Sequence, residues 1–316
     1  MKSKSRNISV TWNITKNCLY NCNICATRNN RVELDRKQKV KALNSIICTN
    51  HFIISELDFA GGDPLTDDSS LETILLAKNL LGNDCVSVTT TGRGIRNVSK
   101  ELLPQLLYRC ELSLDISNTK NIRNEETYSI DSLSVIKEYS EFFRYLTLNI
   151  PILSTDVSKK QINELAKIIN QISVNELRIV LIRLMPVGMQ SSINFPKDYN
   201  PKKVIKYLKE FINPAIPIHL HCVLRGEINQ DVSHCGMAQS KIGIDCSGNV
   251  FSCAWAGDCC NTHKFDTYPF YLGNLLFSNL DDLLCEKKAQ ELSRIAHSYG
   301  TKCALLESKK TMEVIM

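Results

Sequence analysis

The chain has 316 residues, of which 43% are apolar and 22% charged, and its net charge is +5. This length allows one large α/β domain, or a domain of about 200 residues with a smaller one. The positive charge is too dilute and scattered to indicate nucleic-acid binding. A run of about 18 apolar residues and the apolar core of a signal peptide are both missing from the sequence. We therefore expect a cytoplasmic protein that binds neither nucleic acid nor membrane.

The first two thirds of the chain alternate predicted strands and helices. The strands are expected at residues 8–15, 56–60, 85–90, 111–116, 146–153 and 176–184. The helices are expected at residues 34–47, 71–81, 100–107, 131–143, 159–172 and 201–212. Such alternation implies parallel strands joined by right-handed helical crossovers. About six units fit, fewer than the eight of a full barrel, so the predicted fold is α/β, a partial (β/α)6 TIM-like barrel.

The pattern changes after residue 215. The predicted strands become short, at 216–220, 243–245 and 249–252, and a single closing helix is expected at 280–297. Eight of the 14 cysteines also lie in this part. We therefore expect a core domain at residues 1–215 and a small α+β domain at residues 216–316.

Cysteines in a long chain without an export signal are more often ligands or redox groups than disulfide partners. Cys18, Cys22 and Cys25 follow the first predicted strand on one short loop. Zinc sites usually take four ligands from two separated pairs, whereas thiolates are the ligands of a [4Fe–4S] cluster. Three thiolates would hold three irons and leave the fourth open to a small molecule. A cysteine-rich zinc loop is the alternative.

The C-x3-C-x2-C loop resembles the signature of the radical S-adenosylmethionine (SAM) superfamily. The resemblance implies that SAM chelates the open iron and is cleaved reductively to methionine and a 5′-deoxyadenosyl radical. Gly61, Gly62 and Asp63 end the second predicted strand and resemble the family's Gly-Gly-Glu, which grips the SAM amine, with a shorter carboxylate here. The glycines permit close backbone approach.

Other positions in the core resemble SAM-contacting residues of the same family. They lie at or next to the carboxyl ends of the third, fourth and sixth predicted strands and are Thr91, Ser113, Asp115 and Arg183. Because the carboxyl ends of parallel strands meet at one face, these side chains can share a pocket. A buried core hydroxyl at Ser113 and a structural ion pair at Arg183 are the alternatives.

A second cysteine group lies in the C-terminal part. Gly248 predicts a hairpin that would bring Cys235 and Cys253 to one site. Cys259, Cys260 and Cys303 follow, and the stretch resembles the auxiliary-cluster domains called SPASM and Twitch. The family's final Cys-x2-Cys pair is incomplete here, which implies the short form with one auxiliary [4Fe–4S] cluster. Its ligands would be Cys235, Cys253 and Cys303, with Cys259 or Cys260 as the fourth. A zinc site and an open auxiliary iron that binds substrate are the alternatives.

Among the remaining cysteines, one is a candidate functional residue and five are interpreted as structural. Cys222 follows a predicted strand end and could donate a hydrogen atom to a substrate radical, as in peptide epimerases of the superfamily. The others lie in apolar patterns and are interpreted as small core side chains. They are Cys48, Cys85, Cys110, Cys246 and Cys285.

The resemblance implies hydrogen abstraction from a substrate C–H bond, and a ribosomally made peptide that is cross-linked, oxidised or epimerised is the first choice. The sequence leaves little room before Cys18 for the leader-binding module of many such enzymes. A radical dehydrogenase of a small alcohol, such as an aminocyclitol or a sugar, is the second hypothesis. A non-catalytic Fe–S or zinc scaffold is the third. The expected electron donor is flavodoxin- or ferredoxin-like.

Overall fold

The computed structural model describes most of the chain. The described residues are 6–20, 22, 25, 27, 31–114, 128–152, 158–183, 201–227, 235–259 and 269–308. Among them, no helix is long and apolar enough to cross a membrane. Asp115 and Cys260, and the side chain of Cys259, lie outside the described part.

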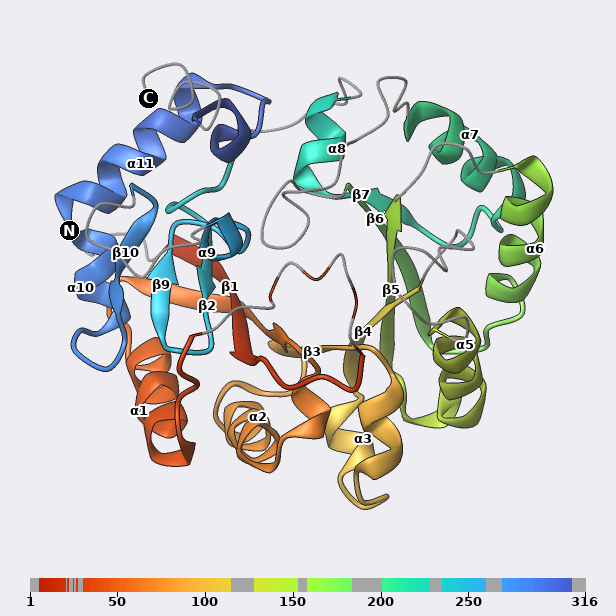
Figure 1. The fold of residues 1–316 in the computed structure, drawn as a ribbon, viewed down its shortest axis with the longest axis horizontal. Helices are drawn as coiled ribbons and strands as arrows, with labels where there is room; N and C mark the ends of the chain where they lie inside the picture. Colours follow the sequence, from red (N-terminus) through yellow and green to blue (C-terminus); the bar gives the residue numbers. More distant parts are fainter. Residues whose placement is uncertain are drawn as a thin grey trace.

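A single ten-stranded sheet forms the frame of the molecule, in the order β10-β9-β8-β1-β2-β3-β4-β5-β6-β7 (Figure 1). The seven neighbours from β1 to β7 are all parallel. Their bounds are Arg6–Thr15, Phe52–Gly61, Val86–Thr90, Arg109–Ser113, Tyr145–Ile152, Glu176–Arg183 and Ile218–Leu220. Within the described residues β7 does not pair with β10, so the barrel is open. The predicted α/β class with a partial TIM-like barrel is confirmed.

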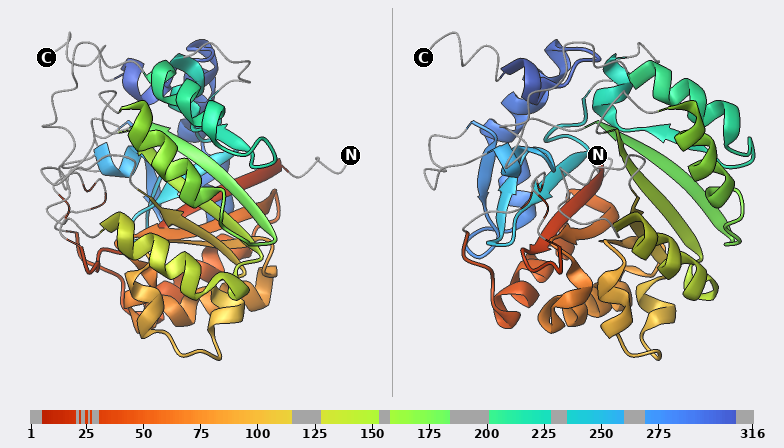
Figure 2. Two further views of the ribbon diagram at one scale, coloured as in Figure 1. Left: turned by 90° about the vertical axis from the view of Figure 1, so that its right-hand side faces the viewer. Right: turned by 45° about the vertical axis from the view of Figure 1, so that its right-hand side comes forward.

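Helices cover the outer face of the curved sheet (Figures 1 and 2). They are α1 (Arg36–Ile47), α2 (Asp68–Leu81), α3 (Leu103–Leu106), α5 (Tyr128–Glu138), α6 (Lys159–Ile169) and α7 (Pro201–Phe211). Strand β1 shows how the two faces differ, because Val10 and Trp12 are fully buried while Thr11 and Asn13 are half-buried. Successive side chains of a strand point to opposite faces. The apolar core therefore lies between sheet and helices, and polar side chains point into the barrel.

The C-terminal part joins the sheet beside its first strand. Strand β8 (Lys241–Ile244) pairs in parallel with β1 and forms an antiparallel hairpin with β9 (Asn249–Phe251). Gly248 has a φ of 78° at the turn, a left-handed conformation that glycine adopts without strain. The predicted hairpin is confirmed, while the domain boundary near residue 215 stays a prediction.

Two details of the C-terminal prediction were wrong. Residues 280–297 form two helices, α10 (Leu280–Cys285) and α11 (Lys287–Ser298), because Glu286 has the extended ψ of 151° that caps the second helix. Strand β10 (Tyr271–Asn274) was not predicted, and it pairs antiparallel with β9. Its Gly273 weakens the strand signal in the sequence. A short helix α8 (Cys222–Glu227) follows β7, and α9 (Ala256–Cys259) follows β9.

The five cysteines that were predicted to be small core side chains are not all buried. Cys110 and Cys246 are buried, and Cys85 packs partly buried against the core, as expected. Cys48 and Cys285 are exposed, so their prediction was wrong. Cys48 caps the C-terminus of α1 and Cys285 is the last residue of α10. Apolar periodicity in the sequence does not show that a helix has ended and turned its last side chain to solvent.

Candidate functional site

A cavity of about 830 Å³ occupies the inside of the open barrel. Its wall includes residues at the carboxyl ends of β1, β2, β3, β4 and β6. Both cysteine groups contribute to this one cavity. The cysteines that line it are Cys18, Cys22, Cys25, Cys222, Cys235, Cys253 and Cys303. The fold thus brings together two groups that lie more than half the chain apart.

The first cysteine group lies on the loop that leaves β1. The Tyr20 backbone N–H donates to the Cys18 Sγ at 3.4 Å, and the Cys25 N–H donates to the Cys22 carbonyl at 3.3 Å. Burial raises the pKa of Cys18 to about 11, and negative charge on Asp63, Cys25 and Cys22 adds to that rise. The three thiols therefore share one electrostatic environment. A cation among them would favour their thiolate forms.

The Gly61-Gly62 turn holds this loop by direct backbone contact. The Gly62 N–H donates to the Thr15 carbonyl at 2.7 Å, and the Asp63 N–H donates to the Asn17 carbonyl at 2.6 Å. A Cβ at Gly61 would lie 2.3 Å from the Thr15 oxygen, and one at Gly62 would lie 2.0 Å from the Asn17 oxygen. Both glycines line the cavity. The end of β2 thus fits closely against the chain that leads to Cys18.

Asp63 is fully buried and does not line the cavity wall. Its carboxylate accepts hydrogen bonds from the Thr90 hydroxyl at 2.8 Å, from the Thr91 hydroxyl and N–H, and from the Leu65 N–H at 3.2 Å. Burial raises its pKa, and these hydrogen bonds oppose the rise. The carboxylate connects the end of β2 to the end of β3. Direct contact with a SAM amine stays a prediction.

Three other predicted SAM residues line the cavity: Thr91, Ser113 and Arg183. They stand at the ends of β3, β4 and β6 as the sequence indicated. Asp115 lies outside the described residues. The structure therefore brings these three to one site, and their role in binding stays a prediction.

The second group is built around Cys235 and Cys303. The backbone N–H groups of Met237 and Ala304 act to lower the pKa of Cys235, and those of Leu305 and Leu306 act to lower the pKa of Cys303. Burial raises the pKa of both thiols, that of Cys303 to about 11. Backbone N–H groups directed at sulfur are typical surroundings of cluster-bound thiolates.

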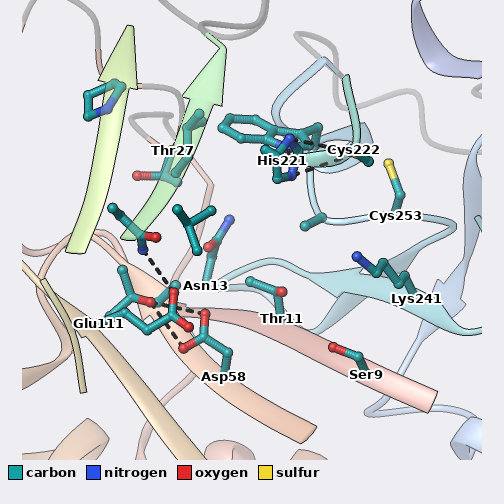
Figure 3. A pocket seen from close by; sticks show the side chains of 18 of the residues that line it. Ser9, Thr11, Asn13, Thr27, Asp58, Glu111, His221, Cys222, Lys241 and Cys253 are labelled. Atoms are coloured by element: carbon teal, nitrogen blue, oxygen red, sulfur yellow. Dashed lines mark hydrogen bonds between the residues drawn. The ribbon is translucent and has the colours of Figure 1, made fainter. Parts of the chain in front are cut away.

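His221 and Trp255 border the second group (Figure 3). The Trp255 Nε1–H donates to the His221 Nε2 at 3.3 Å. Burial lowers the pKa of His221 to about 4, with a further contribution from the Lys241 and Arg225 cations. The imidazole is therefore neutral at pH 7 and carries its proton on Nδ1. The Cys222 Sγ lies 3.6 Å from Nδ1 and 3.7 Å from Nε2 of this ring.

Sequence reasoning missed a polar belt on the inner face of the barrel. Its carboxylates are Glu56, Asp58 and Glu111, and all three line the cavity. Arg109 forms an ion pair with Glu56, and Arg178 forms one with Glu111 at 3.3 Å. Figure 3 shows Asp58 and Glu111 on the opposite side of the cavity from Cys222 and Cys253. Alternating polar residues within β1, β2 and β4 were the signal that could have revealed this belt.

Asp58 is the carboxylate of this belt without a cation beside it. It accepts hydrogen bonds from the Ser87 hydroxyl at 2.9 Å and the Thr89 hydroxyl at 3.0 Å. Burial raises the pKa of Asp58 to about 8, and the charges of Glu111 and Glu56 add to the rise. A carboxyl group that changes protonation near neutral pH thus faces the cavity.

The cysteine sulfurs of the two groups are the type of ligand atom that binds iron–sulfur clusters. The cysteines of both groups that line the cavity offer thiol ligands, and the buried Arg225 Nε, which has no hydrogen-bond partner among the described residues, belongs to a side chain that lines the same cavity. Within the described part of the chain, no three His, Cys, Asp or Glu side chains converge on the position of a single metal ion. A tetrahedral zinc ion would hold its sulfur ligands about 3.8 Å apart. A cluster of several irons spreads its thiolates more widely.

Comparison with solved structures identifies proteins of the same fold. Streptococcus suis SuiB bound to its precursor peptide SuiA matches with a TM-score of 0.67 and 16% identity, over 92% of this chain and 67% of SuiB. SuiB bound to S-adenosylmethionine matches with a TM-score of 0.65 and 16% identity, over 90% of this chain and 66% of SuiB. The chain thus spans about two thirds of SuiB.

A second protein matches over more of its own length. Native anSMEcpe with bound AdoMet and the Cp18Cys peptide has a TM-score of 0.57 and 15% identity, over 92% of this chain and 83% of that one. No protein-family profile and no curated protein sequence matches the chain. At these identities the similarity shows a shared fold.

Proposed function

We propose that this chain is a radical SAM enzyme. One observation carries the proposal: the thiols of the C-x3-C-x2-C loop and the Gly61-Gly62 turn meet at the wall of one large cavity. The fold is one that holds S-adenosylmethionine in other proteins. Cys18, Cys22 and Cys25 would bind a [4Fe–4S] cluster whose reduced form supplies the electron that cleaves SAM to a 5′-deoxyadenosyl radical.

The protein's own residues would position SAM and exclude water. Gly61 and Gly62 line the cavity, so their backbone would be accessible to a bound ligand. Thr91 and Ser113 offer hydroxyl groups at neighbouring strand ends, and Arg183 offers a guanidinium group for an anionic ligand group. The inside of the barrel would keep a reactive carbon radical away from bulk solvent and hold the target carbon at close range.

We further propose that the substrate is a ribosomally made peptide. Two of the fold's relatives were solved with peptides bound, SuiA in SuiB and Cp18Cys in anSMEcpe. The cavity of about 830 Å³ has room for a peptide segment beside a nucleotide. The chain would work in the reducing cytosol with a flavodoxin- or ferredoxin-like electron donor, and would cross-link, oxidise or epimerise the peptide.

The test is anaerobic reconstitution of the wild type and the Cys18/Cys22/Cys25→Ala variant. We expect about eight irons in the wild type and about four in the variant, since each [4Fe–4S] cluster contributes four. With dithionite and SAM, the wild type should form 5′-deoxyadenosine and the variant should not. Equal 5′-deoxyadenosine formation by both, or stoichiometric zinc in place of iron, would contradict the proposal. The Cys285→Ser variant, altered at an exposed helix end, is the matched control.

A further inference from the structure

Cys222 lies with the second cysteine group in space, although it precedes that group in the chain. Cys222, Cys235, Cys253 and Cys303 all line the same cavity, from α8, the β8 approach, the end of β9 and the segment after α11. Charge on Cys222 acts on both Cys235 and Cys303, and charge on Cys235 acts on Cys303. The three thiols are therefore mutual neighbours. Figure 3 shows Cys222 and Cys253 on the same side of the cavity.

Two cationic side chains line the cavity together with these thiols. Lys241 and Arg225 carry charges that act on Cys222, and neither forms an ion pair with a carboxylate of the described chain. The Arg225 side chain lines the cavity, and its Nε is buried with no hydrogen-bond partner within the described residues. A buried polar group without a partner costs about 1–3 kcal/mol. An anionic group held between the thiols would compensate both features, and a cluster bound by four thiolates is such a group.

We propose that Cys222 is the fourth thiolate ligand of an auxiliary [4Fe–4S] cluster, together with Cys235, Cys253 and Cys303. The inference rests on the proposed function for the presence of that cluster. On ligation each thiol loses its proton to solvent, and a sulfur–iron bond forms. Neither Cys259 nor Cys260 is then required as a ligand. Cys222 is also removed as a hydrogen-atom donor, because a ligating sulfur has no S–H bond to give.

His221 favours the ligand role over the donor role. Trp255 donates to the Nε2 of the imidazole, which leaves the Nδ1–H, 3.6 Å from the Cys222 Sγ, as the ring group that can donate to that sulfur. A hydrogen bond donated to sulfur stabilises a thiolate or a ligating sulfur more than a neutral thiol. His221 is thus a positioning residue that would also raise the potential of the cluster, since hydrogen bonds to cluster sulfurs set that potential.

The experiment uses the Cys18/Cys22/Cys25→Ala protein, in which the auxiliary cluster is the only one proposed to remain. Iron is counted after anaerobic reconstitution, and electron paramagnetic resonance of the reduced protein identifies the cluster. We expect about four irons in this background, and loss of at least one iron with a changed spectrum when Cys222→Ala is added. Cys259→Ala and Cys260→Ala should each leave the count and the spectrum unchanged. Cys246→Ala, a buried cysteine away from the cavity, is the matched control for packing.

Two further variants separate ligation from folding. Cys222→Ser keeps an oxygen that can ligate iron, so it should retain more iron than Cys222→Ala and show a shifted spectrum. His221→Phe should retain the iron but lower the midpoint potential of the cluster. Four irons and an unchanged spectrum in Cys222→Ala, or iron loss in Cys259→Ala or Cys260→Ala instead, would overturn the assignment. An iron-free background would also overturn it, while 5′-deoxyadenosine formation by the wild type would leave the proposed function standing.

Discussion

Asp58 is a carboxyl group that the barrel holds close to two others. Its neighbours Glu56 and Glu111 each have an arginine partner, whereas Asp58 has only the hydroxyl groups of Ser87 and Thr89. Because burial and like charge disfavour its ionised form, its pKa lies near 8. In the unfolded chain the pKa of an aspartate is about 3.9. The folded protein therefore binds one proton more than the unfolded chain between these two values.

This difference predicts a pH dependence of stability. Since the folded state holds the extra proton, the free energy of unfolding should fall as pH rises from about 4 to about 8. Asp58→Asn mimics the protonated form and should remove this contribution. We expect the variant to gain on the order of 2 kcal/mol at pH 8 and little at pH 5. Urea unfolding at both pH values measures the difference in the free energy of unfolding between the variant and the wild type. An equal difference at both pH values would contradict its assignment to the protonation of Asp58.

The carboxylate of the single residue Asp63 connects the ends of two strands, β2 and β3. Asp63→Ala would leave the hydroxyl groups of Thr90 and Thr91 and the Leu65 N–H without their acceptor. We expect roughly tenfold weaker SAM binding, since Thr91 would lose its fixed position, and an unchanged iron content. Equilibrium SAM binding and an iron count on the same samples measure this. Asp63→Asn, which keeps one acceptor oxygen, should be intermediate, and unchanged affinity in Asp63→Ala would remove Asp63 from the SAM site.

At the scale of elements, the carboxyl end of β2 supports the loop that leaves β1. Gly61 and Gly62 allow the two backbones to approach so closely that a side chain would collide with the carbonyls of Thr15 and Asn17. The resulting backbone hydrogen bonds fix where the loop toward Cys18 begins. Parallel pairing of β1 with β2 supplies the register for this contact.

Gly62→Ala tests this support. The added Cβ would lie 2.0 Å from a backbone oxygen, so we expect a loss of about 3 kcal/mol in stability and loss of iron from the Cys18 loop. Gly82→Ala is the matched control, because its φ of 88° imposes strain while nothing lies within 4 Å of the new Cβ. That control should cost about 1–2 kcal/mol and retain all iron. Equal iron retention in the two variants would show that the close approach does not support the loop.

At the scale of the whole molecule, a buried ion pair connects the N-terminal part of the chain to its C-terminal part. The Arg31 Nη1 lies 2.7 Å from the Asp245 Oδ2, and both side chains are nearly inaccessible, at 6% and 4% exposure. The Arg31 Nη2 also donates to the Gly257 carbonyl at 2.7 Å. Arg31 follows the first cysteine loop, and Asp245 begins the turn between β8 and β9. The pair therefore helps to hold both cysteine groups at one cavity.

A double-mutant cycle measures this connection. Arg31→Met leaves the Asp245 carboxylate buried without its cation and should cost about 3–5 kcal/mol. The double variant Arg31→Met/Asp245→Asn should recover much of that loss, because it removes both charges. Lys159→Ala, from the exposed Lys159–Glu210 pair, should cost about 1 kcal/mol or less. Additive losses in chemical denaturation would mean that Arg31 and Asp245 do not stabilise each other.

The sequence alone determined the alternation of strands and helices in the core, the hairpin at Gly248 and the spacing of Cys18, Cys22 and Cys25. These features depend on neighbours within a few residues, which sequence periodicity and turn chemistry report directly. Only the tertiary structure decided that Cys222 lies with Cys235 and Cys303, and that the polar faces of β1, β2 and β4 enclose a cavity. These arrangements depend on the packing and curvature of a whole sheet, through contacts between residues far apart in the chain.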